Sequence, residues 1–402
     1  MGAGSRVFFD SCVFERCRLL VLSGAQVTLT SPQFISKPLG EAAINLFAHG
    51  VGTMVTVHGG SIAGGTYGAT VQAGARLEAS GVTISSVEVA GVEAKDEGSV
   101  LKLHACKLHG FSGWYPDDST GVHVHSRSSA HLSSLSMSGM AHGVVAHTHA
   151  CVTMLECTVS DTKHSCVAFI EAATGSLEAC TMSGSKEKCN LKVVGVRSSV
   201  RAARCRSLGS VKGSGLTVAH GDNFAATACA SSGNAHAGYF ALGAGSVLDI
   251  TDCSSDGDVI GCVVHGPSEV TATNVAITGC AKSGFHVDDG GSARLTACSV
   301  SDCGEVGVMV VHEGSRAALE GCTLRKNGQS GTVADAGSVV EVKGCNSSGH
   351  VGAGYKSQRG AHMTVSTSSS DGDGQDCGES GGGQLTIHEF SVDGVVRGGR
   401  PL

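Results

Sequence analysis

Titratable residues recur at alternate positions in the first third of the chain. Two such pairs and one further histidine form the set Glu93, Lys95, His123, His125 and His147. An imidazole or an amine could abstract a proton beside the carboxylate of a uronic acid, while a carboxylate serves as the acid. These five residues are therefore candidates for acid–base catalysis on a polysaccharide.

The segment FSGWYPDD, residues 111–118, lies between these two pairs and carries aromatic and acidic side chains. It holds Trp114, the single tryptophan of the chain, next to Tyr115, and it ends with Asp117 and Asp118. Two carboxylates at a suitable separation hydrolyse a glycosidic bond, so Asp117 and Asp118 are further catalytic candidates. Aromatic rings with a polar edge suit a wet, partly apolar ligand, so Trp114 and Tyr115 are candidate binding residues.

No motif in the chain predicts a metal or a cofactor. The stretch HTHAC places His147, His149 and Cys151 at alternate positions, as a zinc site could. A strand, however, puts alternate residues on one face by geometry alone. The stretch DGDGQD at 371–376 lacks the third oxygen ligand and the following glycine of an EF-hand loop. We therefore expect no metal site and no cofactor.

A sequence repeat predicts the strands that would position these residues. One column of small apolar residues returns every 22–25 residues from Leu135 onward. Its members are Cys12, Val82, Cys106, Leu135, Cys157, Cys180, Cys205, Cys229, Cys253, Val275, Cys298, Cys322 and Cys345. A metal and disulfides are alternative explanations, but valine cannot ligate, and residues stacked ~4.8 Å apart exceed the Cβ separation of a disulfide. We interpret the cysteines as buried thiols that pack like small hydrophobes.

Each repeat predicts three short strands joined by turns. In one repeat the strands lie at 323–325, 331–335 and 338–342, and Gly, Ser, Asn and Asp fill the gaps. Only residues 41–50 carry apolar residues at a helical spacing. Three strands cannot bury their apolar side chains alone, so the repeats must stack around one core. The predicted fold is all-β, a right-handed parallel β-helix of about 16 coils.

Each repeat consists of an apolar residue and a corner residue, followed by a turn, a glycine and an alternating strand. This pattern resembles the right-handed β-helix proteins of the pectate-lyase-like superfamily. It is also similar to their non-enzymatic relatives, including the β-helix parts of some F-box proteins. The resemblance implies a site along the strand that the glycine opens. It also implies an asparagine ladder at the corner, which we take to be replaced by cysteine. The chain lacks the Asp-Pro-His motif of the epimerases and the arginine of the lyases, which favours a non-catalytic relative.

On the strand that follows each glycine, we expect the side chains of the second and fourth residues after the glycine to face outward. In the middle of the chain this rule predicts an apolar strip of Val167, Phe169, Val194, Phe240, Leu242 and Val263. Such a strip marks an interaction surface, whereas a register slip of one residue would turn these side chains into the core. The candidate binding residues in this row are Phe169, Phe240, Leu242, His265, His286 and Asp288.

Composition limits the partners of the chain. A net charge of −7 without a basic run gives no electrostatic footprint for nucleic acid, and no apolar run is long enough to span a membrane. The amino terminus lacks the features of a signal peptide, and 18 cysteines without an export signal favour a reducing compartment. We expect a cytoplasmic protein, or an extracellular one if the chain is trimmed from a longer precursor.

One β-helix domain is expected over residues 1–402, with turn insertions near 36–50 and 111–118 and a loose loop at 371–383. No segment suits a cap at either end, so the ends could self-associate. Our first hypothesis is a non-catalytic repeat protein whose extended face binds a protein or a polysaccharide. One alternative is a polysaccharide lyase, glycoside hydrolase or uronate epimerase with its site between Glu93 and His147. Another is a structural rod that assembles end to end.

Overall fold

The fold is all-β, as predicted. The computed structural model describes residues 4–36, 44–110, 119–392 and 395–397. Within these ranges no helix occurs, so none there could cross a membrane. The strands form three parallel sheets, A, B and C, wound as a β-solenoid of about 16 turns. The chain divides into two compact units, Met1–Arg201 and Ala202–Leu402, which are described separately.

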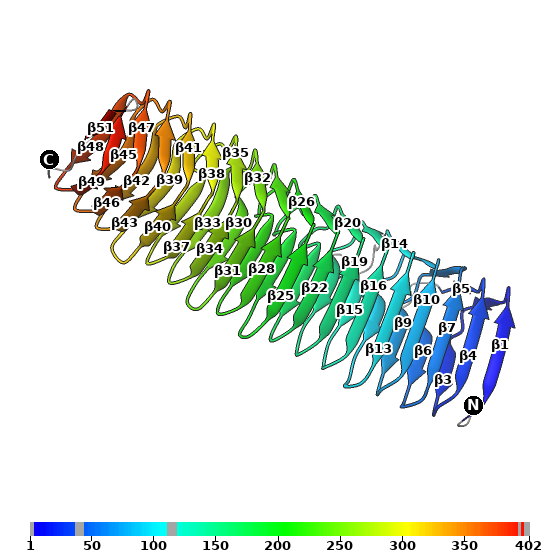
Figure 1. The fold of residues 1–402 in the computed structure, drawn as a ribbon. Coiled ribbons are helices and arrows are strands. Elements are labelled where there is room, and N and C mark those ends of the chain that lie inside the picture. Colours follow the sequence, from blue (N-terminus) through cyan, green and yellow to red (C-terminus); the bar gives the residue numbers. More distant parts are fainter. Residues whose placement is uncertain (1–3, 37–43, 111–118, 393–394, 398–402) are drawn as a thin grey trace. The chain divides into compact units, whose positions relative to one another are not determined.

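In the first unit, strands of the same sheet lie side by side in the blue-to-cyan part of the ribbon (Figure 1). Sheet A contains β1 (Arg6–Asp10), β4 (Gln26–Thr30), β7 (Met54–His58), β10 (Arg76–Ser80), β13 (Val100–His104), β16 (Ser129–Ser133), β19 (Cys151–Leu155) and β22 (Thr174–Glu178). Sheet B contains β2 (Val13–Glu15), β5 (Gln33–Ile35), β8 (Ser61–Ala63), β11 (Thr83–Ser85), β14 (Lys107–His109), β17 (Ser136–Ser138), β20 (Thr158–Ser160) and β23 (Thr181–Ser183). Sheet C contains β3 (Leu19–Leu22), β6 (Ile44–His49), β9 (Tyr67–Gln72), β12 (Ala90–Ala94), β15 (Thr120–Val124), β18 (His142–Ala146), β21 (Val167–Ile170) and β24 (Leu191–Val194).

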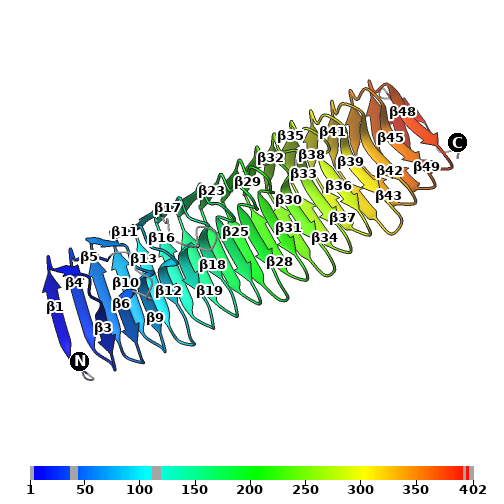
Figure 2. The same cartoon turned by 180° about the vertical axis from the view of Figure 1, so that it is seen from behind.

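The second unit repeats this order of strands, in the green-to-red part of Figure 2, and β25 (Ser199–Ala203) spans the division between the units. Sheet A contains β28 (Asn223–Thr227), β31 (Val247–Thr251), β34 (Glu269–Thr273), β37 (Ser292–Thr296), β40 (Arg316–Glu320), β43 (Val339–Lys343), β46 (His362–Ser366) and β49 (Gln384–His388). Sheet B contains β26 (Arg206–Leu208), β29 (Ala230–Ser232), β32 (Ser254–Asp256), β35 (Ala276–Thr278), β38 (Ser299–Ser301), β41 (Thr323–Arg325), β44 (Asn346–Ser348), β47 (Ser369–Asp371), β50 (Phe390–Val392) and β51 (Val395–Arg397). Sheet C contains β27 (Leu216–Ala219), β30 (Ala237–Leu242), β33 (Ile260–His265), β36 (Phe285–Asp288), β39 (Val306–Val311), β42 (Ser330–Asp335), β45 (Ala353–Gln358) and β48 (Gln375–Ser380).

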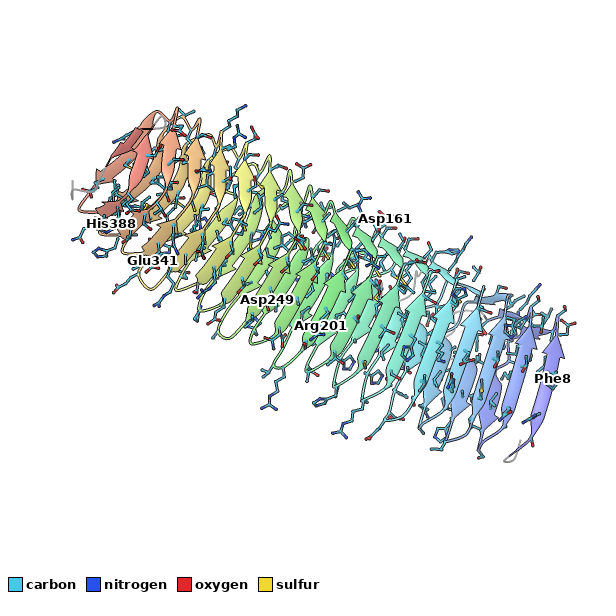
Figure 3. The ribbon with its side chains drawn as sticks, in the orientation of Figure 1. Phe8, Asp161, Arg201, Asp249, Glu341 and His388 are labelled. Atoms are coloured by element: carbon cyan, nitrogen blue, oxygen red, sulfur yellow. The ribbon has the colours of Figure 1, made fainter. Side chains whose placement is uncertain are left out.

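Alternation along each strand separates the core from the surface. In β13, Leu101 and Leu103 are buried, and the residues between and after them face outward. In the second unit, Asp249 and Glu341 occupy outward positions of sheet A and lie on the outside of the ribbon (Figure 3). Because successive side chains of a strand point to opposite faces, this pattern fixes which residues can reach a ligand.

The cysteine column lies inside both units, as predicted. Cys106 and Cys253 are 1% and 2% exposed, and Val275 takes the same place at 1%. The Sγ of Cys253 lies 3.3 Å from the carbonyl oxygen of Thr251, two residues earlier. None of the cysteines forms a disulfide, and Cys12 is half-buried. The interpretation of the column as packed thiols is confirmed.

A second column, of polar side chains, lies in the turn before sheet C, and the sequence analysis missed it. In the second unit, Asn234 Oδ1 accepts a hydrogen bond from Ser210 N at 2.9 Å, and Asp258 Oδ1 accepts one from Asn234 N at 2.7 Å. Asp373 Oδ1 accepts from His350 N in the same way at 2.8 Å. Each side chain satisfies a backbone N–H of the preceding coil, which would be costly to bury unpaired. The asparagine-type ladder is therefore present, at a different corner from the cysteines.

Three segments differ from the sequence expectations. Ile44–His49, within the stretch of helical spacing, forms strand β6. Gln375–Ser380, within the expected loose loop, forms β48 and pairs with β45. Beyond the last parallel coil, β51 pairs antiparallel with β50, so another strand covers that edge of sheet B. Sheet pairing outweighs the local sequence signal in all three segments.

Candidate functional site

Sheet C of the first unit brings the predicted acid–base residues together. Glu93 in β12 pairs in register with His123 in β15, so their side chains lie on adjacent rungs of the outward face. His125 and His147 directly follow β15 and β18, and their N–H groups continue the hydrogen bonding of the sheet. We call Glu93, His123, His125 and His147 the Glu93 cluster.

Short distances connect the members of the Glu93 cluster. His125 Nε2 lies 3.3 Å from Glu93 Oε1, and His123 Nε2 lies 2.8 Å from His147 Nε2. The centroids of the His125 and His147 rings are 5.0 Å apart, and the rings are parallel within 5°. Lys95 Nζ lies 3.9 Å from Glu93 Oε2, at the edge of the group. The convergence of these side chains, predicted from their spacing, is therefore present.

Burial and neighbouring charges set the protonation of the cluster. Burial lowers the pKa of His123 to about 4, and the charges of His125 and His147 act in the same direction. Burial also lowers the pKa of His147. Burial works to raise the pKa of Glu93, but the hydrogen bond from His125 and the charge of Lys95 outweigh it, and the pKa lies below its ordinary value. At neutral pH the cluster thus holds an ionised Glu93 carboxylate and neutral imidazoles at His123 and His147.

Hydroxyl groups behind the rings orient two of the histidines. Thr148 Oγ1 donates to Glu171 Oε2 at 3.1 Å, so at 2.8 Å it can only accept from Nδ1–H of His147. His147 therefore presents an unprotonated Nε2 to the cluster. His125 Nδ1 lies 3.1 Å from Ser126 Oγ, on the side of the ring away from Glu93.

Several other predicted residues do not join this cluster. Trp114, Tyr115, Asp117 and Asp118 lie outside the described residues. His147, His149 and Cys151 span the corner between β18 and β19, where Thr148 and His149 have positive φ angles, so they do not share a strand face.

A second group of histidines and carboxylates lies on sheet C of the second unit. His265 Nδ1 lies 2.8 Å from Asp288 Oδ1, and His286 Nε2 lies 3.6 Å from Asp288 Oδ2. Strand alternation predicts these three residues, but it does not predict Asp289 and His312, whose Oδ1 and Nδ1 atoms lie 3.1 Å apart. Both lie just after a strand, at turn positions that strand alternation does not reach. Burial works to raise the pKa of Asp288, but the hydrogen bonds from His286 and His265 keep it below its ordinary value.

The predicted apolar strip is wrong at its first two members. Phe169 and Val167 are fully buried, because Val144 pairs with Val167 and Cys166 therefore occupies the place of the opening glycine. This shift of one residue turns both side chains into the core. In the second unit the rule gives the outward positions correctly, but Val263, which pairs with Phe240, is only 6% exposed. Phe240 and Leu242 are half-buried at outward positions, and the ring of Phe240 meets His236 edge-on at 5.0 Å.

A groove that the sequence analysis did not anticipate crosses sheet A of the first unit. It consists of two adjoining hollows of about 360 Å³ and about 390 Å³ that share His131 and Ser133. One row of side chains along it is His58, Ser80, His104, Ser133, Leu155 and Glu178. The parallel row is Thr56, Glu78, Lys102, His131, Thr153 and Ser176. Strand pairing could have placed these rows, but no sequence signal distinguishes them from an ordinary polar surface. We call this feature the sheet A groove.

The family profile described as "right handed beta helix region" matches residues 43–206, 90–255 and 214–370. The chain belongs to this right-handed β-helix family. This confirms the predicted right-handed β-helix. A search of curated protein sequences found no match.

Several solved β-helix structures are similar to this chain. The periplasmic alginate epimerase AlgG is 10% identical, with a TM-score of 0.46, over 93% of this chain and 78% of that one. The A-module of the mannuronan C-5 epimerase AlgE4 of Azotobacter vinelandii is 13% identical, with a TM-score of 0.35, over 92% and 91%. The catalytic domain of a GH87 α-1,3-glucanase is 7% identical, with a TM-score of 0.33, over 85% and 60%. This likeness extends to the fold alone.

Proposed function

We propose that this β-helix protein binds an extended polysaccharide in the sheet A groove without cleaving it. The supporting observation is the pair of polar rows in register. Because neighbouring strands lie ~4.8 Å apart, each row offers a polar group at that interval along the groove. A chain of hydroxyl-rich units could hydrogen-bond to it repeatedly.

Hydrogen bonds hold the histidine rings of the groove in orientations that suit such a ligand. His58 Nδ1 and His104 Nδ1 each lie 3.0 Å from a serine hydroxyl on the next strand, and His131 Nδ1 lies 2.8 Å from Thr153 Oγ1. These contacts fix each ring and turn its Nε2 away from the neighbouring hydroxyl. Leu155 is the one large exposed apolar side chain that lines the two hollows, so the groove lacks the aromatic anchors on which protein interfaces depend. The lining thus favours a polysaccharide over a protein.

Glu78, the carboxylate of the first hollow, is not suited to act as the acid in glycoside cleavage. The hydrogen bond from Arg76, helped by Lys102, holds the pKa of Glu78 below its ordinary value despite the opposing effect of burial. A general acid requires the opposite shift, toward a protonated carboxyl group at neutral pH. Binding without turnover is therefore the better-supported function.

Calorimetry with soluble neutral and uronate polysaccharides tests this proposal. The double variant His104→Ala/His131→Ala removes the rings at the join of the two hollows and should weaken binding at least tenfold. Glu341→Ala, on sheet A of the second unit, is the control and should bind like the wild type. Absence of binding to every polysaccharide, or equal binding by the double variant, would contradict the proposal.

A second candidate function is proton transfer on a uronate polysaccharide at the Glu93 cluster. It is favoured by the neutral His123 and the ionised Glu93, which could act as bases at neutral pH. Unsaturated products and reducing ends can be measured in the same samples. Product formation that His125→Ala abolishes would establish an enzyme, whatever the fate of binding in the groove.

A further inference from the structure

All four side chains of the Glu93 cluster carry atoms that can bind a metal ion. One ligand atom each from Glu93, His123 and His125 lie within 4.8 Å of one another. His147 is not one of these three, but its Nε2 lies 2.8 Å from that of His123, so rotation of its ring could bring in a fourth ligand. We propose that these four side chains bind one Zn²⁺ ion on sheet C of the first unit. This inference is independent of the proposed binding of a polysaccharide on sheet A.

Two of the distances between ligand atoms are close to those of a tetrahedral zinc site. With Zn–N bonds of ~2.0–2.1 Å, ligand atoms of a tetrahedron lie about 3.3 Å apart. The separation of His125 Nε2 from Glu93 Oε1 is already 3.3 Å. His123 and His147 must separate by about half an ångström to admit the ion. Both rings are at the surface of the sheet and only half-buried, so rotation of their side chains can supply this movement.

The hydrogen bonds behind the rings prepare the ligands. The chain of Glu171, Thr148 and His147 fixes the His147 lone pair on Nε2, facing the cluster. When the ion binds, His125 and His123 must each present an unprotonated Nε2, so the proton that His125 donates to Glu93 and the one that His123 donates to His147 both move to Nδ1 of their own rings. Ser126 Oγ accepts the Nδ1 proton of His125. Outer hydrogen bonds of this kind orient metal-bound histidines and raise their basicity. Thr148 and Ser126 are thus positioning residues.

The donor set selects the class of metal. Three imidazoles and one carboxylate suit Zn²⁺, whereas Ca²⁺ and Mg²⁺ require mainly oxygen ligands. The group on sheet C of the second unit differs, since its compact part is His265, Asp288 and Asp289, with one nitrogen donor and two carboxylates. The side chain of Asp289 is 54% exposed, against 9% for Glu93. We therefore place zinc in the first unit.

Zinc titration of chelator-stripped protein, with a competing chromophoric chelator, tests the site. We expect one Zn²⁺ per chain, with affinity reduced at least 100-fold in His123→Asn and in His147→Asn. Thr148→Val leaves all four ligands in place and should reduce affinity about 10- to 100-fold, the range found for outer hydrogen bonds. His362→Asn removes an exposed histidine of β46 as a matched control and should bind like the wild type.

Cobalt substitution separates this site from adventitious binding to exposed thiols such as Cys17 and Cys151. Co²⁺ in the Glu93 cluster should give visible bands of a tetrahedral nitrogen and oxygen site without thiolate-to-metal charge transfer. If a histidine variant fails to fold, Thr148→Val, checked by circular dichroism, still decides the matter. No stoichiometric zinc, a thiolate spectrum, or unchanged affinity in the folded variants would overturn the proposal.

Discussion

The outward face of sheet C carries histidines and carboxylates in both units, but the two groups are built differently. In the first unit His123 and His125 lie beside one carboxylate, Glu93, whose side chain is 9% exposed, and His147 packs against both rings. In the second unit two carboxylates, Asp288 and Asp289, share three histidines, of which His265 is 38% exposed. The first group places nitrogen donors beside one buried carboxylate, and the second alternates histidines with more exposed carboxylates.

This difference shows that environment, more than residue type, decides what the same strand positions can do. Burial lowers the pKa of His123 and His147, so those rings keep their lone pairs at neutral pH. Exposed ion pairs such as His312 with Asp289 gain little energy because water screens them. A ligand site therefore fits the first unit, whereas the second group is compatible with an ordinary solvated surface.

The largest expected effect contrasts two phenylalanines of sheet C. Phe169, in the first unit, is fully buried, and Phe169→Ala should destabilise that unit by about 3–5 kcal/mol because it leaves a cavity. Phe240, in the second unit, is half-buried at an outward position, and Phe240→Ala should cost about 1 kcal/mol or less. Hydrogen exchange of peptides from β21 and β30 measures both. Equal losses would mean that the register difference between the strands is wrong.

The coiled fold could be predicted from the sequence because the column residues recur at nearly constant intervals, for example from Cys229 to Val275. It could not predict the inward turn of Phe169, because Cys166 replaces the glycine that sets the register there. The convergence of Glu93 and His123 followed from coil length, since paired residues must stack. The orientation of His147 did not, because it depends on the hydroxyl of Thr148, a residue in a left-handed turn.

The second largest expected effect is a difference in acid stability in metal-free protein. It concerns the Glu93 cluster of the first unit and the group around Asp288 in the second. The pKa of His123 is lowered to about 4 in the folded chain, against about 6.5 when unfolded. The unfolded state therefore binds the proton first, and stability is lost as pH falls from about 6.5 to about 4, by on the order of 1–3 kcal/mol. The pKa of Asp288 is also lowered, so its contribution is lost only below about 3.9, the unfolded value.

Hydrogen exchange of β15 and β36 peptides between pH 4 and 7, corrected for the intrinsic rate, distinguishes these windows. Protection of β15 should fall first, and His123→Asn should flatten its pH dependence while β36 is unchanged. The same protection in β15 at pH 5 and pH 7 would show that His123 titrates as it does in an unfolded chain.

The smallest effect concerns the polar ladder inside the turns, where the two units also differ. The first unit has uncharged Thr162 and Ser185 in this region, but the second has Asp258, which is fully buried. Burial raises the pKa of Asp258, although hydrogen bonds from Ser255 and Asn234 oppose the shift. A raised pKa means that stability is full below about 3.9 and is lost as pH rises through the folded value. At neutral pH the buried charge is therefore a cost.

Asp258→Asn should remove that cost and keep the ladder. The amide oxygen can accept from Asn234 N, as Asp258 Oδ1 does at 2.7 Å, and the amide nitrogen can donate to Ser255 Oγ. We expect the second unit to gain on the order of 1 kcal/mol at pH 7 and nothing near pH 3.5. Exposed Asp249→Asn is the control, and denaturation at both pH values gives the comparison. A loss of stability at pH 7 would mean that the ionised carboxylate holds the Asn234 turn better than an amide can, so that the ladder requires charge at this rung.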